Sequence, residues 1–197
     1  TVRIDDGATV ADYERCAMLR FRDATTVTGH DDDLGAVDTR SNLDDWEGRI
    51  PSDWDPTPLG HAAVRDWRVG VRRSDMLRDT VGLATELARL TQNQAPVHRD
   101  PALGPEGRRL VYGGHTIGLA QASLVRMLPD TATVLGWQAC DHLGPVFEGD
   151  VLACHHTLLD ERPAAGGRLR AVRVEVDSDS GGEVTPVLDW RVVTWGA

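Results

Sequence analysis

The residues with the clearest chemical potential lie in one loop and at the start of the segment that follows it. Residues 93–98 read Asn-Gln-Ala-Pro-Val-His and place His98 in a polar loop, while Gly113 and Gly114 open an apolar segment. An imidazole is the usual proton acceptor near neutral pH. A helix that begins at the glycines would present unpaired N–H groups and a partial positive charge. Such groups stabilise a carbonyl oxygen as it gains negative charge, and a thioester carbonyl would suit them.

Each of these residues also has a plainer structural interpretation. The missing side chains of Gly113 and Gly114 let a substrate approach the backbone, but the same pair also simply makes the turn into a helix. His98 follows a proline in a polar loop, which is equally typical of a surface or capping residue. Tyr112 either lines a pocket or belongs to the core. His115, at the helix opening, either supplies an acid or base or is buried.

The elements that must position these residues follow from hydrophobic periodicity. Apolar residues in helical spacing predict a helix over 71–90 that delivers the loop at Asn93, with Gly82 as an interruption. Residues 114–128 are apolar on nearly every side, which predicts a buried helix that ends at Pro129. Four strand-like stretches follow, at 133–140, 150–159, 168–176 and 186–195. One long helix before an antiparallel meander predicts an α+β fold in which a curved sheet wraps the helix.

The two ends of the sequence resemble each other. Residues 2–22 look like a β-hairpin that turns at residues 5–7 and has a long second strand from Val10 to Phe21. The pattern Val-x-Asp-aromatic at residues 10–13 returns at 187–190, each time after a short acidic turn that contains glycine. This echo predicts that residues 1–22 are the terminal hairpin of a first, mostly absent unit. The sequence would then be a fragment or processed half of a two-unit protein. The alternative is chance similarity.

Between the hairpin and the predicted helix, residues 23–70 carry acidic runs and a cluster of prolines without sustained periodicity. This composition predicts a linker or a surface wrap. We expect Trp46, Trp54 and Trp67 to anchor it, because three tryptophans are too apolar for a free tail.

The composition limits the classes of partner. The formal net charge of −10 argues against a nucleic-acid partner, because phosphate binding needs a basic face. No apolar run of about 18 residues is present, so no membrane association is expected. Cys16, Cys140 and Cys154 are widely spaced and lack the pattern of a disulfide framework or a zinc site, which favours a reducing, cytoplasmic compartment.

Metal binding is not expected either. His155 and His156 are neighbours on a predicted strand, so their side chains point to opposite faces and do not chelate one ion together. The acidic run Asp31–Asp33 lacks the spacing of a calcium loop. We therefore infer no metal and no other cofactor. Asp141 and His142, after the first strand, face either the pocket or a subunit seam, and no role follows for them.

These motifs resemble the MaoC-like (R)-specific enoyl-CoA hydratase and dehydratase family, whose fold is the hotdog. The family loop reads Asp-x-Asn-Pro-[Ile/Leu]-His-x-Asp, its helix begins near a His-Gly pair, and a later strand carries Pro-Val-x-x-Gly-Asp. Here residues 93–100 read Asn-Gln-Ala-Pro-Val-His-Arg-Asp, the helix begins at residues 112–113, and residues 145–150 read Pro-Val-Phe-Glu-Gly-Asp. The resemblance covers roughly residues 75–197, with the strongest match over residues 90–152, and the predicted hotdog domain comprises residues 71–197. It also extends to double-hotdog members, and implies a second hotdog unit in the same chain or a partner chain, as in a dimer.

One departure from the family pattern bears on the chemistry. The family's catalytic aspartate falls on Asn93 and its asparagine on Ala95. The resemblance implies that His98 takes the proton of the water that adds to an enoyl-CoA, and that Asn93 orients this water. An amide orients water but does not take its proton. Asn93 is equally suited to stabilising a turn.

The resemblance implies an acyl-CoA thioester as substrate, with Tyr112, Gly113, Gly114 and His115 at the reacting end. Arg99, Arg108 and Arg109 lie beside the motif and either contact the CoA phosphates or serve as surface charge.

Three functions remain open at this point. The first is hydration of 2-enoyl-CoA and the reverse dehydration of 3-hydroxyacyl-CoA. The second is thioester hydrolysis with His98 or His115 activating water. The third is a non-catalytic, acyl-binding half of a double-hotdog protein.

Overall fold

The computed structural model describes residues 2–10, 23, 25–27, 29, 42–60 and 67–197, which belong to two compact units, Thr1–Gly35 and Ala36–Ala197. In the first unit a tight turn closes with a hydrogen bond of 2.9 Å from the Arg3 amide to the Ala8 carbonyl oxygen. This is the predicted turn at residues 5–7. Most of the predicted strand from Val10 to Phe21 lies outside the described residues, so the first hotdog unit stays a prediction.

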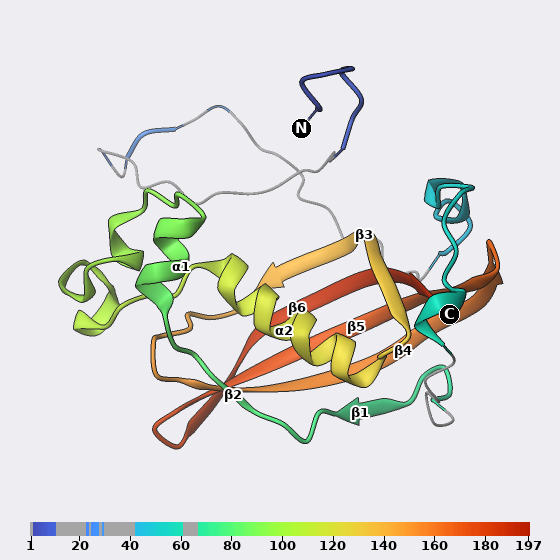
Figure 1. The fold of residues 1–197 in the computed structure, drawn as a ribbon. Coiled ribbons are helices and arrows are strands. Elements are labelled where there is room, and N and C mark those ends of the chain that lie inside the picture. Colours follow the sequence, from blue (N-terminus) through green and yellow to red (C-terminus); the bar gives the residue numbers. More distant parts are fainter. Residues whose placement is uncertain (1, 11–22, 24, 28, 30–41, 61–66) are drawn as a thin grey trace. The chain divides into compact units, whose positions relative to one another are not determined.

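The second unit is built on one antiparallel sheet (Figure 1). Its long strands are β3 (Thr131–His142), β4 (Val151–Ala164), β5 (Gly167–Ser180) and β6 (Glu183–Gly196). Two short strands, β1 (Arg72–Ser74) and β2 (Asp79–Thr80), pair with β4, and the order is β1-β4-β5-β6-β3. The predicted meander of four strands is therefore confirmed. Each strand is longer than its apolar core predicted, because the pairing continues through polar residues at the strand ends.

The sheet buries side chains on both faces, with the two-residue alternation expected of a strand. On β5, Val172, Val174 and Val176 face the long helix, whereas Leu169 and Ala171 belong to a second apolar cluster on the other face. This second cluster includes Leu43 and Ile50 from the segment before the sheet, and the aromatic rings of Trp46 and Trp54 contact Gly136 and Trp195. Trp67 lies in the main core. The three tryptophans thus attach this segment to the unit, as expected.

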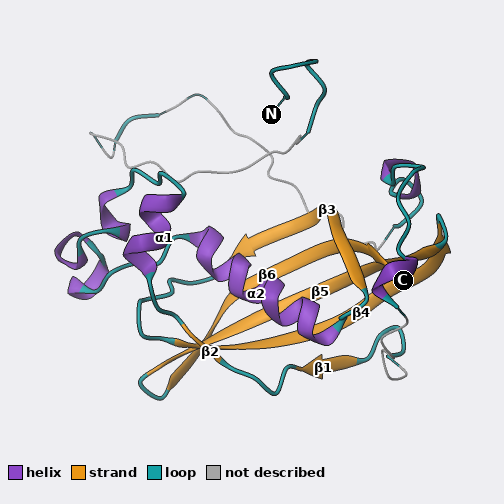
Figure 2. Ribbon diagram, viewed as in Figure 1, coloured by secondary structure: helices purple, strands orange, loops and turns teal. Residues whose placement is uncertain are grey.

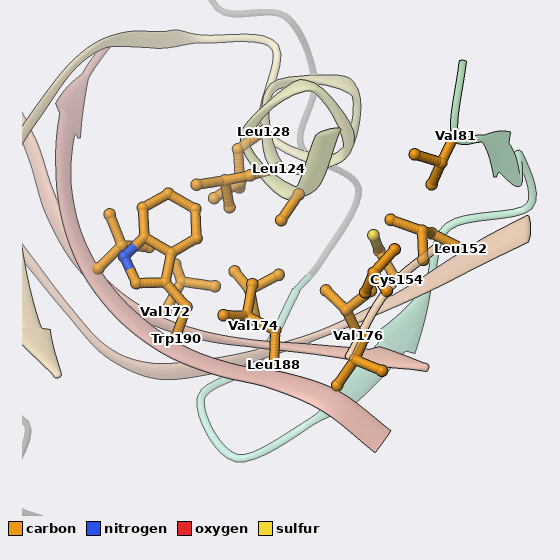
Figure 3. Packing of buried hydrophobic residues seen from close by; sticks show 14 of the residues in the cluster. Val81, Leu124, Leu128, Leu152, Cys154, Val172, Val174, Val176, Leu188 and Trp190 are labelled. Carbon is orange, nitrogen blue, oxygen red and sulfur yellow. The ribbon is translucent and has the colours of Figure 1, made fainter. Parts of the chain in front are cut away.

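The long helix, α2 (Gly113–Met127), lies in the concave side of the curved sheet. Figure 3 shows Leu124 and Leu128 pointing from the helix side toward Val172, Val174 and Trp190 of the sheet. The predicted helix and its wrapping by a sheet are confirmed. Its burial is one-sided within the described residues, however, because Gly118, Gln121, Ala122 and Val125 are exposed.

The helix predicted over 71–90 is wrong for its first part. Only α1 (Ala84–Leu90) is helical, and the preceding residues form β1, β2 and their connections. The edge of β4 offers backbone partners to Arg72–Ser74, and these hydrogen bonds override the weak helical pattern. Leu83, with φ 55°, breaks the chain direction immediately before α1. Figure 2 shows α1 and the short turns after it beside the end of α2 at which that helix begins. Among the described residues, no helix combines the length and apolarity needed to cross a membrane.

The packing of α2 gives a first prediction. Leu124 is 0% exposed and its neighbour Val125 is 41% exposed, so the two positions differ in burial on the same helix. Leu124→Ala should lower the free energy of unfolding by about 3 kcal/mol, because it leaves a cavity against the sheet. Val125→Ala should change it by less than about 0.5 kcal/mol. Denaturant titration of both variants checks this, and equal losses would contradict the observed orientation of the helix.

Candidate active site

The loop that carries His98 is held in place by α1. The backbone N–H of Asn93 donates to the backbone carbonyl of Ala88 at 2.9 Å, and the chain turns away from the end of α1 at this point. The Asn93 side-chain oxygen, Oδ1, accepts from the Ala95 amide at 2.9 Å. Asn93 therefore stabilises the turn, which is the plainer of its two interpretations. A short 3-10 turn, Pro96–His98, then brings the imidazole to the loop end.

The His98 ring is fixed by one backbone group. Its Nδ1 lies 2.8 Å from the carbonyl oxygen of Leu110. Because a carbonyl only accepts, Nδ1 must carry the proton, and in the neutral ring Nε2 then holds the free lone pair. No hydrogen bond to Nε2 occurs within the described part of the chain. The arrangement leaves His98 as a base with a defined proton-accepting atom.

The same contact places His98 beside the start of α2. Its ring meets that of Tyr112 edge to face, with centroids 6.1 Å apart, and Tyr112 is the residue before the first helical turn. Tyr112 makes no side-chain hydrogen bond to the helix start. The structure thus brings the rings of His98 and Tyr112 together at the helix start that Gly113 and Gly114 form.

The two glycines are needed for contacts within the protein. A Cβ on Gly114 would lie 2.4 Å from the Tyr112 hydroxyl oxygen. A Cβ on Gly113 would lie 2.6 Å from Nε2 of His142. Two rings therefore occupy the space beside the helix start that the missing side chains leave. The predicted role of the glycine N–H groups in holding a thioester oxygen stays a prediction.

His115 belongs to the first turn of α2 and is 9% exposed. Its amide donates to the Tyr112 carbonyl, and its Nδ1 has no hydrogen-bond partner among the described residues. Burial lowers the pKa of His115, an effect that the charge of Glu148 partly opposes. His115 is therefore neutral at physiological pH, and of its two interpretations the structure shows the burial.

The arginines beside the motif bind groups of the protein itself. Arg99 donates to the Asn93 carbonyl oxygen, and Arg109 donates to the Arg99 carbonyl oxygen and to the Glu148 carboxylate. These contacts brace the loop that holds His98. Arg108 pairs with Asp150 at 2.7 Å, and its guanidinium lies over the Phe147 ring. Contact of Arg99 or Arg109 with CoA phosphates stays a prediction.

Residues 145–150, expected on a strand, instead form a turn before β4 begins at Val151. The buried Asp150 accepts hydrogen bonds from the Phe147 amide and the Ser178 hydroxyl, which close the turn. A backbone bridge then links Phe147 to Leu110, the residue whose carbonyl orients His98. Residues 145–150 therefore act on the site indirectly, by holding the backbone of Leu110 that orients the His98 ring.

The adjacent histidines on β4 point to opposite faces, as predicted. His155 lies 3.2 Å from the Asp177 carboxylate, while His156 is 0% exposed and places Nε2 2.8 Å from the Ser123 hydroxyl on α2. Ser123 in turn donates to Asp75 at 2.7 Å. Within the described residues, no three His, Cys, Asp or Glu side chains gather as ligands for a metal.

Known proteins share much of this chain. A mesaconyl-CoA hydratase of Cereibacter sphaeroides is 32% identical over 179 residues, which is 86% of this chain and 51% of the relative. A beta-methylmalyl-CoA dehydratase of Chloroflexus aurantiacus is 30% identical over 117 residues, covering 55% of this chain and 33% of the relative. A solved structure from Mycobacterium tuberculosis, of a conserved hypothetical protein with a double hotdog fold, is 40% identical. It superposes with a TM-score of 0.64 over 73% of this chain and 45% of that one. No protein-family model matches.

A long helix wrapped by a curved antiparallel sheet, shared with that structure, defines the class as a hotdog fold. The loop and turn motifs at residues 93–100 and 145–150, together with the hydratase and dehydratase relatives, support a place for the chain in the MaoC-like hotdog family. It spans about half the length of the hydratase and of the double-hotdog protein.

Two residues of the site received no role from the sequence. His142 ends β3, and only the register of β3 against β6 reveals that its ring reaches Gly113. Glu148 lies inside the quoted motif at a variable position, so the motif itself gave no reason to select it. Its carboxylate accepts from the Ala84 amide at 3.2 Å and so holds the beginning of α1.

The environment of His156 gives a second prediction. Burial lowers the pKa of His156 from 6.5 to about 4. The unfolded chain therefore binds a proton before the folded one, and stability is lost as the pH falls from 6.5 toward 4. This residue should account for a loss of about 3 kcal/mol over that range.

Denaturant titrations at several pH values check this prediction. His156→Gln should flatten the pH dependence of the free energy of unfolding. The matched variant His155→Gln, on the opposite face of β4, removes only the minor effect of the His155 charge on this pKa, so most of the wild-type slope should remain. A His156→Gln profile parallel to the wild type would refute the assignment.

Proposed function

We propose that this unit adds water to the double bond of a 2-enoyl-CoA thioester and, in reverse, removes it from a 3-hydroxyacyl-CoA. The carrying observation is the hydrogen bond between His98 Nδ1 and the Leu110 carbonyl, which leaves Nε2 as a proton acceptor beside the start of α2. The names of two relatives, a hydratase and a dehydratase, support the same reaction type in its two directions.

The proposed step runs from water to the β-carbon of the substrate. His98 Nε2 takes one proton from water as the oxygen bonds to the β-carbon. The electron pair of the double bond moves through the α-carbon to the thioester oxygen, which the N–H groups of Gly113 and Gly114 stabilise. The α-carbon then takes the proton back from His98, and the carbonyl reforms. Dehydration follows the same path in reverse.

Asn93 limits this chemistry. Its Oδ1 is used by the Ala95 amide, so its side-chain NH₂ is the group left to hold the water. An amide does not accept a proton, and His98 therefore carries the proton transfer alone. In a non-catalytic, acyl-binding half of a double-hotdog protein, Asn93 would have only this structural role in the turn. Binding without turnover is accordingly the second candidate function.

The sheet supports the proposal of a hotdog partner. Among the described residues β3 pairs only with β6, which leaves one side of its 12 residues open. Residues 131–140 contain no charge and no proline, the usual protection of a free edge. We therefore place a second hotdog unit, from the same chain or a partner chain, along β3. The double hotdog fold of the Mycobacterium tuberculosis protein supports such an arrangement.

The proposed reaction gives a third prediction. In the whole protein, His98→Ala should lower kcat for a 2-enoyl-CoA by about 100-fold to 10,000-fold, because it removes the general base. Loss of the enoyl absorbance, with free thiol followed in the same sample, measures hydration and thioester hydrolysis separately. His155→Ala, on the face of β4 away from α2, is the matched control and should keep the wild-type rate.

Three other outcomes would each reject the hydratase proposal. Thiol release without hydration would favour the thioesterase. Binding of enoyl-CoA without any turnover would favour the acyl-binding half. Hydration that is unaffected by His98→Ala would move the chemistry to another site.

The open edge of β3 gives a fourth prediction. Amides of β3 that do not bond to β6 should exchange with deuterium as slowly as those of β5, because a second unit pairs with them. Native mass spectrometry of the same sample should show either a dimer or a chain that contains both units. Fast exchange along β3, at the rate of exposed loop amides, would exclude this edge as the interface.

A further inference from the structure

His142 lies at the site without a role in the reaction described above. It is the last residue of β3, and its ring rests on Gly113, the first residue of α2. Its Nε2 and Cε1 lie 2.6 and 2.7 Å from the position that a Cβ on Gly113 would take. Gly113 is therefore the residue that allows this imidazole to lie against the helix start.

The ring is uncharged in this position. Although His142 is exposed as a residue, partial desolvation of its ring lowers its pKa, and the neighbouring charge of Asp141 opposes the shift in part. The positive end of α2 also disfavours an imidazolium. A neutral imidazole has one N–H group and one acceptor nitrogen, and in the tautomer that carries the proton on Nε2 His142 presents a hydrogen-bond donor at the helix start.

A second observation concerns the same turn of α2, which contains a buried polar atom without a hydrogen-bond partner among the described residues. The side chain of His115, nine-tenths buried in the first turn of α2, leaves Nδ1 without a partner among the described residues. The side chain of Tyr112 caps none of the helix N–H groups. An unpaired polar atom in a buried turn can be completed by a bound water or ligand.

The geometry points to His142 as a further catalytic residue, which donates a hydrogen bond from Nε2 to the thioester oxygen. This inference rests on the proposed function. When water adds to the β-carbon, the electron pair displaced from the double bond accumulates on that oxygen. His142 stabilises the charge and keeps its own proton, so the transfer between water, His98 and the α-carbon is unchanged. A side-chain donor would then act beside the backbone N–H groups of the helix.

Two substitutions at position 142 separate the hydrogen bond from the packing. His142→Phe keeps a ring against Gly113 but has no donor, whereas His142→Gln keeps an N–H donor. In the whole protein, His142→Phe should lower kcat by about 100-fold with little change in KM, and His142→Gln should stay within about 10-fold of the wild type. His155→Phe is the control for a ring substitution away from the site. Equal kcat values for His142→Phe and the wild type would overturn the inference.

Gly113→Ala provides an independent variant. A Cβ at this position would lie 2.6 Å from Nε2 of His142, so the imidazole has to move, and a melting temperature close to that of the wild type shows that the fold accommodates the change. The added methyl group would displace the His142 ring, and kcat should therefore fall as it does in His142→Phe. Full activity of Gly113→Ala would count against the assigned contact.

A binding measurement keeps this test separate from the test of the reaction. The probe is 4-(dimethylamino)cinnamoyl-CoA, whose absorption moves to longer wavelength when its carbonyl accepts a hydrogen bond. The red shift seen with the wild type should shrink in His142→Phe and persist in His142→Gln. If no substrate is turned over but this pattern holds, the hydratase proposal fails and the role of His142 stands. If turnover occurs and the red shift is the same in the wild type and in both variants at position 142, the hydratase proposal stands and the role of His142 fails.

Discussion

The site depends on the hydrogen bonds and the ion pair that the buried carboxylate of Asp150 makes. The carboxylate accepts hydrogen bonds from Arg108, the Phe147 backbone N–H and the Ser178 hydroxyl. The backbone carbonyl of Asp150 accepts from the Val81 backbone N–H. One residue thus joins β5, the turn before β4, the loop leading to α2 and the segment leading to α1. A carboxylate that is 2% exposed is tolerated only when its oxygens are fully paired. The position of His98 relative to the start of α2 follows from these pairings, because Leu110 and Phe147 form a backbone bridge.

The parts of the fold that the sequence predicted are those in which one local pattern dominates. The apolar run of α2 and the alternating residues of the strands bury large side chains. The spacing of these buried residues therefore predicted both the type of each element and the order of the elements along the chain. The segment before α1 was mispredicted because its apolar residues are sparse, and pairing of Arg72–Ser74 with the edge of β4 decided its form. Tertiary hydrogen bonds of that kind leave no trace in the spacing of residues.

The same distinction applies to the site. His98, Tyr112 and the glycines lie close together along the chain, so a loop and a helix start were enough to place them. His142 comes from the far end of β3, and its contact with Gly113 depends on the irregular register of β3 against β6. The arginines also have contacts that their spacing did not reveal. Their positions beside the motif suggested a ligand, but each donates to a carbonyl or carboxylate of the protein, which only the folded backbone provides.

The side chain of Asn93 is uncharged, and the charged groups around it are largely paired within the protein. The nearby carboxylates are already neutralised, Glu148 by Arg109 and Asp150 by Arg108. His115 and His142 are uncharged because desolvation lowers the pKa of each. Negative charge that develops on a substrate oxygen would therefore meet carboxylates at Glu148 and Asp150 that already have arginine partners. It would be stabilised by oriented dipoles, namely the helix N–H groups and a neutral imidazole, whose arrangement is fixed before the substrate binds. Such a site favours a transient enolate over a permanently charged ligand, which is the selectivity that addition of water to an enoyl thioester requires.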